Sequence, residues 1–279
     1  MPAARLSFGD VLSESFGFFF NNLALFFHLV TIPWILSLLL RIAGDAIAAD
    51  SLLVVLLEKA ADVVPTVMFL VAWMRVTLLG PRQLDHPPGL RWSARETAFL
   101  VQLLRIAGIT FLLLAAFTLT AGPIEPAALG QVPLDPEIAR REALAAPLGT
   151  GFFISALLAL RVSFSLAAAA VDVPFTPRQA WAASRGNAWP IIGVLFVIFF
   201  TSGIATIVAA LVPLSLVQGL LGGTTGAAVI AWTIATLVSY GGAALIATAQ
   251  AVIFRRLTGW RSGVPFAVPT ASSALHSPC

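Results

Sequence analysis

Three arginines interrupt long apolar stretches of this sequence: Arg75, Arg105 and Arg161. A charged side chain surrounded by lipid is costly, so an arginine in such a stretch is a candidate functional residue. It would bind a lipid phosphate, or carbonyl and carboxylate groups of a neighbouring helix, for example Asp172. A further pair of arginines closes the last apolar stretch. The candidate lipid or partner contacts are therefore Arg75, Arg105, Arg161, Arg255 and Arg256.

Arg105 allows two interpretations. It either faces an aqueous cavity within the membrane, or its long side chain extends from an interfacial helix to the headgroups. We favour the second, because Arg105 comes only twelve residues after a helix start at Ser93. For Arg75 and Arg161 we favour a structural role in orienting and packing the helices.

Few other residues suggest chemistry. The three histidines, His28, His86 and His276, and the single cysteine, Cys279, do not have the spacing of metal ligands. The sequence holds no phosphate-binding loop, nucleophile elbow, zinc-protease motif or dinucleotide fingerprint. We therefore predict a non-enzymatic protein with no metal and no cofactor.

The composition is that of a membrane protein. Of the 279 residues, 59% are hydrophobic and only 10% are charged, and the mean hydropathy is +0.95, whereas a soluble domain carries about 25% charged residues. The net charge of +3 could suit nucleic acid, but the arginines are spread over several loops and form no basic stripe. We predict an all-α membrane domain over residues 1–261 and no nucleic-acid partner.

Six stretches approach the roughly 20 apolar residues that a membrane-spanning helix needs. Polar segments at 41–62 and 122–148 read as loops, with a shallow helix within the first, and the segment from Pro213 to Gly226 reads as a turn. The tail, 262–279, is predicted to be a disordered cytoplasmic segment. The predicted spans are 23–43, 62–80, 99–121, 149–171, 189–212 and 226–254.

Three amphipathic helices are predicted to lie on the membrane surface. Residues 7–22 place apolar side chains at three- and four-residue spacing opposite Asp10 and Glu14. The helix start at Ser7 has counterparts at Ser93, with Glu96 three residues later, and at Thr176, followed by Pro177 and Gln179. Each start precedes a pair of predicted spans.

These parts suggest a threefold helical-hairpin repeat. The second span of each pair ends in arginine, at Arg75, Arg161 and Arg255-Arg256, and the distance from helix start to arginine is 68, 68 and 80 residues. Such units would share one topology and form parallel repeats. The alternative is that every inward-going span simply ends in arginine.

The charge distribution predicts the orientation. One side holds eleven arginines, and the other holds three arginines and one lysine. Because cytoplasmic loops carry the excess of basic residues, both termini are predicted to be cytoplasmic, in a bacterial inner membrane. Asp10 and Glu14 precede the first apolar run, which is unlike a cleavable signal peptide.

Three segments resemble the bacterial six-span family described as glycerophosphoryl diester phosphodiesterase membrane domain-like, together with related uncharacterised families: FGDVLSESFGFFFNN, LLALRVSFSLAAAAVDVPFTPRQAWAASRGNAW and AVIFRRLTG. The resemblance covers most of the chain and implies a membrane-embedded accessory or lipid-associated role. Some members are fused to a soluble phosphodiesterase domain. This sequence holds no such domain, so the activity is not expected to carry over.

We therefore expect a lipid-associated or accessory subunit in membrane or envelope homeostasis, with membrane lipids and other membrane proteins as partners. The alternative is a transporter or permease for a lipid or small amphiphile, with its route between the repeats. A continuous polar cavity containing Gln102 and Arg105 would favour transport. A dry bundle packed through small residues would favour the first function.

Overall fold

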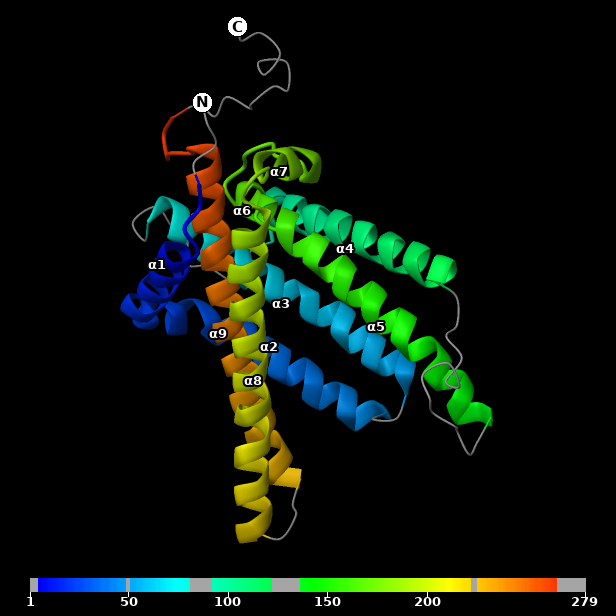
Figure 1. Cartoon of the computed structure of the whole chain (residues 1–279). Coiled ribbons are helices and arrows are strands. Elements are labelled where there is room, and N and C mark those ends of the chain that lie inside the picture. Colours follow the sequence, from blue (N-terminus) through cyan, green and yellow to red (C-terminus); the bar gives the residue numbers. More distant parts are fainter. Residues whose placement is uncertain (1–4, 49–50, 81–91, 122–135, 222–224, 265–279) are drawn as a thin grey trace, which may run out of the picture.

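The computed structural model describes residues 5–48, 51–80, 92–121, 136–221 and 225–264. All the regular elements of this part of the chain are α-helices, which confirms the predicted all-α class (Figure 1). They are α1 (Phe8–Asn21), α2 (Leu23–Ala48), α3 (Leu52–Leu79), α4 (Ala94–Ala121), α5 (Pro136–Val162), α6 (Ser165–Ala170), α7 (Pro177–Ala183), α8 (Ala188–Leu221) and α9 (Thr225–Thr258).

The six longest helices form three antiparallel hairpins, α2–α3, α4–α5 and α8–α9 (Figure 1). The hairpins meet where α3, α5 and α9 end, which we name the arginine end because Arg75, Arg161, Arg255 and Arg256 lie there. From this end the α8–α9 hairpin diverges from the other two (Figure 1). The short helices α1, α6 and α7 lie at the arginine end.

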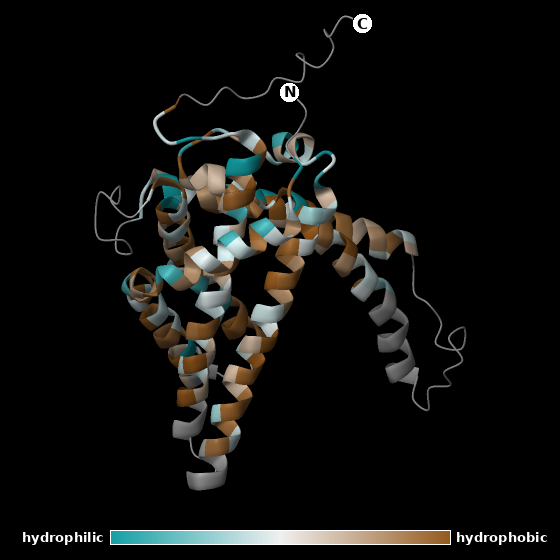
Figure 2. Ribbon diagram, turned by 60° about the vertical axis from the view of Figure 1, so that its left-hand side comes forward, coloured by the Kyte–Doolittle hydropathy of each residue, from teal (hydrophilic) through white to brown (hydrophobic). Residues whose placement is uncertain are grey.

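Four helices are long and apolar enough to cross a membrane, Leu23–Gly44, Ala94–Ala121, Ala188–Leu216 and Val229–Thr258. Their most apolar windows are only 17% to 28% buried. Hydrophobic residues run along the long helices, and hydrophilic residues gather mainly near the arginine end (Figure 2). Together these features indicate a membrane-embedded protein. The expected spans at 62–80 and 149–171 are not among the four; they lie in α3 and in α5 with α6.

The predicted loops are partly wrong. Within the segment 41–62, α2 continues to Ala48 and α3 begins at Leu52. The second half of the loop expected at 122–148 is the first part of α5, and its first half lies outside the described residues. Pro213 lies inside α8 instead of starting a turn. In each case the polar or proline residues are compatible with helix, since apolar neighbours continue the packing and a membrane helix tolerates proline.

The expected span at 149–171 is interrupted. Helix α5 ends at Val162, and α6 begins at Ser165. The Ser163 hydroxyl donates a 2.9 Å hydrogen bond to the Leu160 carbonyl oxygen, a local bond that competes with the regular helix ladder. After α6, Asp172 turns the chain with a φ of 58°.

The predicted helix starts are confirmed. The Ser7 hydroxyl accepts a bond from the Asp10 backbone, and α4 begins directly after Ser93. Thr176 and Gln179 form a reciprocal capping box. These bonds satisfy backbone donors that the first helical turn leaves unpaired.

The arginine end also contains the densest packing. The second half of α9 is buried against Trp73 of α3, whose indole Nε1 donates to Thr248 Oγ1 at 2.8 Å. Small residues bring helices close within the hairpins, as expected for membrane helices. A Cβ atom added at Gly242 of α9 would lie 2.6 Å from Ser202 Cβ of α8.

Candidate functional site

The arginines at the arginine end bind neighbouring helices. Arg255 and Arg256, in the last turn of α9, pair with Glu14 of α1. The Nη2 of Arg256 lies 2.7 Å from Glu14 Oε2, and its Nη1 lies 3.8 Å from Asp10 Oδ2. A single carboxylate thus accepts from two guanidinium groups, and α1 is held across the end of α9.

Arg161, near the end of α5, holds α7. Its guanidinium carbon lies 3.6 Å from the centre of the Trp181 ring. Its Nε donates a 2.9 Å hydrogen bond to Ser184 Oγ, and its Nη2 lies 3.4 Å from the Trp181 carbonyl oxygen. Stacking on the ring and bonding at the edge use the planar shape of the guanidinium, which lysine does not have.

Arg75 of α3 makes the third polar contact. It is linked to α4 through Asp172, whose carboxylate also binds Arg95. Its Nη1 is 3.4 Å from the Ala170 carbonyl oxygen and 3.8 Å from Asp172 Oδ2. The same carboxylate binds Arg95, in the first turn of α4, at 2.8 Å from its Nη2 and through its Nε. Asp172, expected as an acidic neighbour of these arginines, therefore binds two of the basic side chains.

The three contacts follow a cyclic order. The arginine of the first hairpin reaches the start of the second hairpin, through Asp172. Arg161 of the second hairpin binds α7, which precedes the third. Arg256 of the third hairpin binds α1, which precedes the first. The polar contacts at the arginine end thus form a closed ring that links all three hairpins.

Gln102 and Arg105 of α4 differ in burial. The Gln102 side chain is buried, and its Nε2 donates to Ser165 Oγ at 2.9 Å and to the Phe175 carbonyl oxygen at 3.3 Å. Arg105, one turn later on α4, is exposed on the surface. The two side chains therefore lie in different environments, one buried between helices and one exposed.

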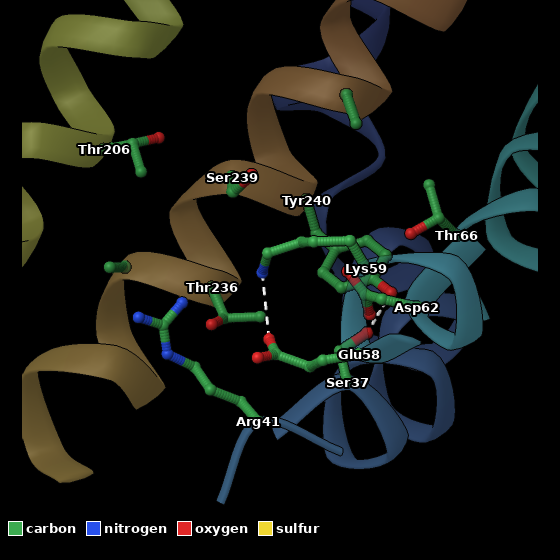
Figure 3. Close-up of a pocket in the computed structure, with 12 residues that line it drawn as sticks. Ser37, Arg41, Glu58, Lys59, Asp62, Thr66, Thr206, Thr236, Ser239 and Tyr240 are labelled. Carbon is green, nitrogen blue, oxygen red and sulfur yellow. Dashed lines mark hydrogen bonds and ion pairs between the residues drawn. The ribbon is translucent and has the colours of Figure 1, made fainter. Parts of the chain in front are cut away.

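A separate polar pocket lies between the first and third hairpins (Figure 3). Its volume is about 230 Å³. Helices α2, α3, α8 and α9 all contribute to its wall, and the hydroxyl and charged groups point toward one another across it. The polar lining residues are Ser37, Arg41, Glu58, Lys59, Asp62, Thr66, Thr206, Thr236, Ser239 and Tyr240.

Some of these groups bind one another. Ser37 Oγ and the Tyr240 hydroxyl lie 2.7 Å apart, and the Tyr240 hydroxyl is 3.4 Å from the Pro33 carbonyl oxygen. Lys59 Nζ lies 2.9 Å from Glu58 Oε1 (Figure 3). The Lys59 side chain is 56% exposed and that of Glu58 is 11% exposed, so the pocket opens to the surface beside Lys59.

Two charged groups of the pocket keep a buried atom without a partner. Arg41 Nε and Asp62 Oδ1 are both buried, and neither has a hydrogen-bond partner. The Arg41 guanidinium carbon lies 4.8 Å from the centre of the Trp232 ring, a contact that provides no acceptor oxygen. An unpaired buried donor or acceptor costs about 1–3 kcal/mol, and more when charged. The pocket therefore has one cation and one anion with bonding capacity left.

All four helices reach the pocket at a similar number of residues from the arginine end. Arg41, Asp62, Thr206 and Tyr240 each lie seventeen or eighteen residues from the end of their helix at the arginine end. At 1.5 Å per residue this is about 26 Å along the helices, close to the roughly 30 Å thickness of the hydrocarbon layer. Along the helices, the pocket thus lies about 20 Å from Arg75 on α3 and about 24 Å from Arg256 on α9.

The sequence analysis missed the pocket because Glu58, Lys59 and Asp62 were assigned to a loop. A signal was present. Ser37 and Arg41 are four residues apart, and Glu58, Asp62 and Thr66 follow at the same spacing, so each set lies on one face of a helix. Had both helices been extended through the expected loop, these polar faces would have been visible.

Among the described residues, no cluster of His, Cys, Asp or Glu side chains could hold a metal ion. No protein-family model matches the chain, and no curated protein or solved structure matches it either. The family resemblance drawn from the three sequence segments therefore stays a prediction, and function is inferred from the ring of arginine contacts and the polar pocket.

Proposed function

We propose that this chain is a non-enzymatic, lipid-associated protein of a bacterial inner membrane that acts in membrane or envelope homeostasis. The observation that carries the proposal is the polar pocket between the first and third hairpins, which lies about 20–24 Å along α3 and α9 from the arginine ring. Such a site reaches the headgroup layer, while exposed apolar side chains on the neighbouring helices, such as Leu39 and Ile207, contact acyl chains.

The proposal includes six membrane spans in three helical hairpins that share one orientation in the membrane, with both termini in the cytoplasm. The order of the arginine contacts supports a threefold arrangement, because Arg161 and Arg256 each bind the short helix that precedes a hairpin, and Arg75 shares the Asp172 carboxylate with Arg95 at the start of α4. The α1 and α7 helices would then lie at the inner headgroups, where the basic side chains at this end favour anionic lipid. Reporter fusions at residues 55 and 130 should both report a non-cytoplasmic location; cytoplasmic signals from both would contradict this topology.

Lipid association is tested on the full-length protein extracted from its native membrane in polymer discs. Native mass spectrometry should detect lipid that remains bound after transfer to detergent, and removal of this lipid should lower the melting temperature. A protein that keeps no lipid, and whose melting temperature lipid does not change, would contradict the proposal. A membrane protein that copurifies in fixed ratio would identify the accessory role.

A second candidate function is transport of a lipid or small amphiphile between the hairpins. The divergence of the α8–α9 hairpin and the pocket at its contact with α2 and α3 favour it (Figure 1). Vesicles containing the protein and a fluorescent lipid should then lose more than half of the signal to an external quencher, because inner-leaflet lipid becomes accessible. Quenching equal to that of protein-free vesicles would exclude lipid transport under these conditions.

A further inference from the structure

We propose that the pocket binds a zwitterionic phosphoethanolamine headgroup, with its phosphate at Arg41 and its primary ammonium at Asp62. This inference rests on the proposed lipid association and specifies which class of lipid headgroup the pocket binds. It follows from the charges that the pocket leaves free, from the chemistry of the groups beside them and from the height of the pocket.

Of the four charged side chains that line the pocket, only Arg41 and Asp62 are left to bind a ligand. Lys59 and Glu58 bind each other at 2.9 Å and neutralise one another. Arg41 and Asp62 each keep a buried atom without a hydrogen-bond partner. A purely anionic headgroup would satisfy Arg41 and leave Asp62 unpaired beside a new negative charge. A zwitterion satisfies both, and it adds no net charge to the pocket.

Arg41 is suited to the phosphate. Its guanidinium is positioned by Trp232 through a cation–π contact at 4.8 Å, which leaves its N–H donors available. Guanidinium groups bind phosphate oxygens through two parallel hydrogen bonds. A phosphate at this position would also give the buried Nε an acceptor.

Asp62 is suited to a primary ammonium. The hydroxyl groups that line the pocket near it, on Thr66, Ser37 and Tyr240, provide further acceptors. A primary ammonium has N–H donors for these oxygens, whereas the trimethylammonium of choline has none. Choline groups bind instead to the faces of aromatic rings, and Arg41 already lies over the face of Trp232.

The size and position of the pocket fit a headgroup and not a whole lipid. A volume of about 230 Å³ accommodates a small polar group, while the acyl chains would lie along exposed side chains of the adjoining helices, such as Leu36 and Leu39 of α2. The pocket lies about 26 Å along the helices from the arginine end, and the proposed topology places it near the headgroups of the outer leaflet.

The test measures how lipids with different headgroups stabilise the purified, delipidated full-length protein. The series is phosphatidylethanolamine, its mono- and dimethylated forms, phosphatidylcholine and phosphatidylglycerol, all with the same acyl chains. We expect the apparent affinity to fall stepwise as each methylation removes one N–H donor, and to be at least about tenfold lower for phosphatidylcholine, which has no N–H donor for Asp62. This series requires no variant, so it is independent of any folding defect.

Two variants then assign the ends of the headgroup. Arg41→Gln should weaken binding of ethanolamine and glycerol lipids alike, by about tenfold. Asp62→Asn should remove the preference for ethanolamine over choline and glycerol lipids. Arg261→Gln is the matched control, because it removes an exposed arginine that lies outside the pocket and is not one of the candidate lipid contacts, and it should leave the order of affinities unchanged. Soluble phosphoethanolamine added as competitor distinguishes the source: displacement of the lipid would identify a free zwitterion as an equally good ligand.

Equal stabilisation by all five lipids, unchanged in Arg41→Gln and Asp62→Asn, would overturn this inference while lipid association would stand. Absence of stabilisation by every lipid would overturn both this inference and the proposed function.

Discussion

Glu14 of α1 and Arg256 of α9 are 242 residues apart in the sequence, yet their side chains meet at 2.7 Å between Oε2 and Nη2. Arg255 binds the same carboxylate. This contact closes the ring at the arginine end, since it joins the last hairpin to the helix that precedes the first. At this end Arg256 and Arg161 hold the short helices α1 and α7, and Arg75 contacts Asp172 between α6 and α7.

Substituting Glu14 tests this closure. Glu14→Gln keeps the size of the side chain and removes the charge that pairs with two arginines. We expect a loss of about 1 kcal/mol in stability, as for a partly exposed ion-pair network, and faster hydrogen exchange in α1 measured by mass spectrometry. Asp10→Asn is the matched control on the same helix, because Asp10 is more exposed and lies 3.8 Å from Arg256; equal effects of the two changes would contradict the assigned role of Glu14.

Arg161→Lys distinguishes planar stacking from simple charge. Lysine keeps the positive charge but loses the face that lies over Trp181 and the edge that bonds Ser184. We expect Arg161→Lys to lower the melting temperature nearly as much as Arg161→Ala, with about 1–2 kcal/mol lost in each. Arg105→Lys should leave the melting temperature unchanged, since Arg105 is exposed. Full stability of Arg161→Lys would show that charge alone is sufficient there.

Asp172 combines a charge with a left-handed backbone, its φ being 58°. Asn adopts this conformation readily, whereas Ala does so at a cost of about 1–2 kcal/mol. Asp172→Asn should therefore report only the lost pairing with Arg75 and Arg95, and this loss should shrink at high salt. Asp172→Ala should be less stable than Asp172→Asn at every salt concentration.

Asp172→Gly supplies the control, because glycine removes the charge without the steric penalty. Thermal unfolding of the three variants separates the two contributions. If Asp172→Ala were as stable as Asp172→Gly, the strain argument would be wrong.

Gly242 tests close packing inside the third hairpin. A Cβ there would lie 2.6 Å from the Cβ of Ser202, so Gly242→Ala should separate α8 and α9 and cost about 1–3 kcal/mol. Gly203→Ala is the matched control on the facing helix, because no atom lies within 4 Å of a Cβ added there. It should be neutral or stabilising.

The double variant Gly242→Ala with Ser202→Gly should recover part of the loss, since it moves the Cβ from one helix to the other. Cross-linking efficiency between cysteines placed on α8 and α9, in a Cys279→Ser background, measures the separation directly. An unchanged efficiency and melting temperature in Gly242→Ala would show that the hairpin adapts without cost.

The amino-acid sequence by itself determined the local features of this protein. The apolar composition indicates lipid as the surrounding solvent, and the helix starts at Ser7, Ser93 and Thr176 follow from side chains that bond their own first turn. Such signals are read correctly because all their atoms lie within a few residues of each other. The ends of α3 and α9 could be predicted for the same reason, since the chain changes from apolar to polar there.

Only the tertiary structure decided where polar segments are helical and which side chains meet. Residues 58–62 and 136–148 carry charged side chains and read as loops, yet they form parts of α3 and α5, because helix formation depends on tertiary contacts as well as on local polarity. The break at Ser163 and the partners of Arg75, Arg161 and Arg256 depend on how α6, α7 and α1 dock. The pocket draws its polar groups from helices up to two hundred residues apart, as with Ser37 and Tyr240, and sequence spacing does not encode such contacts.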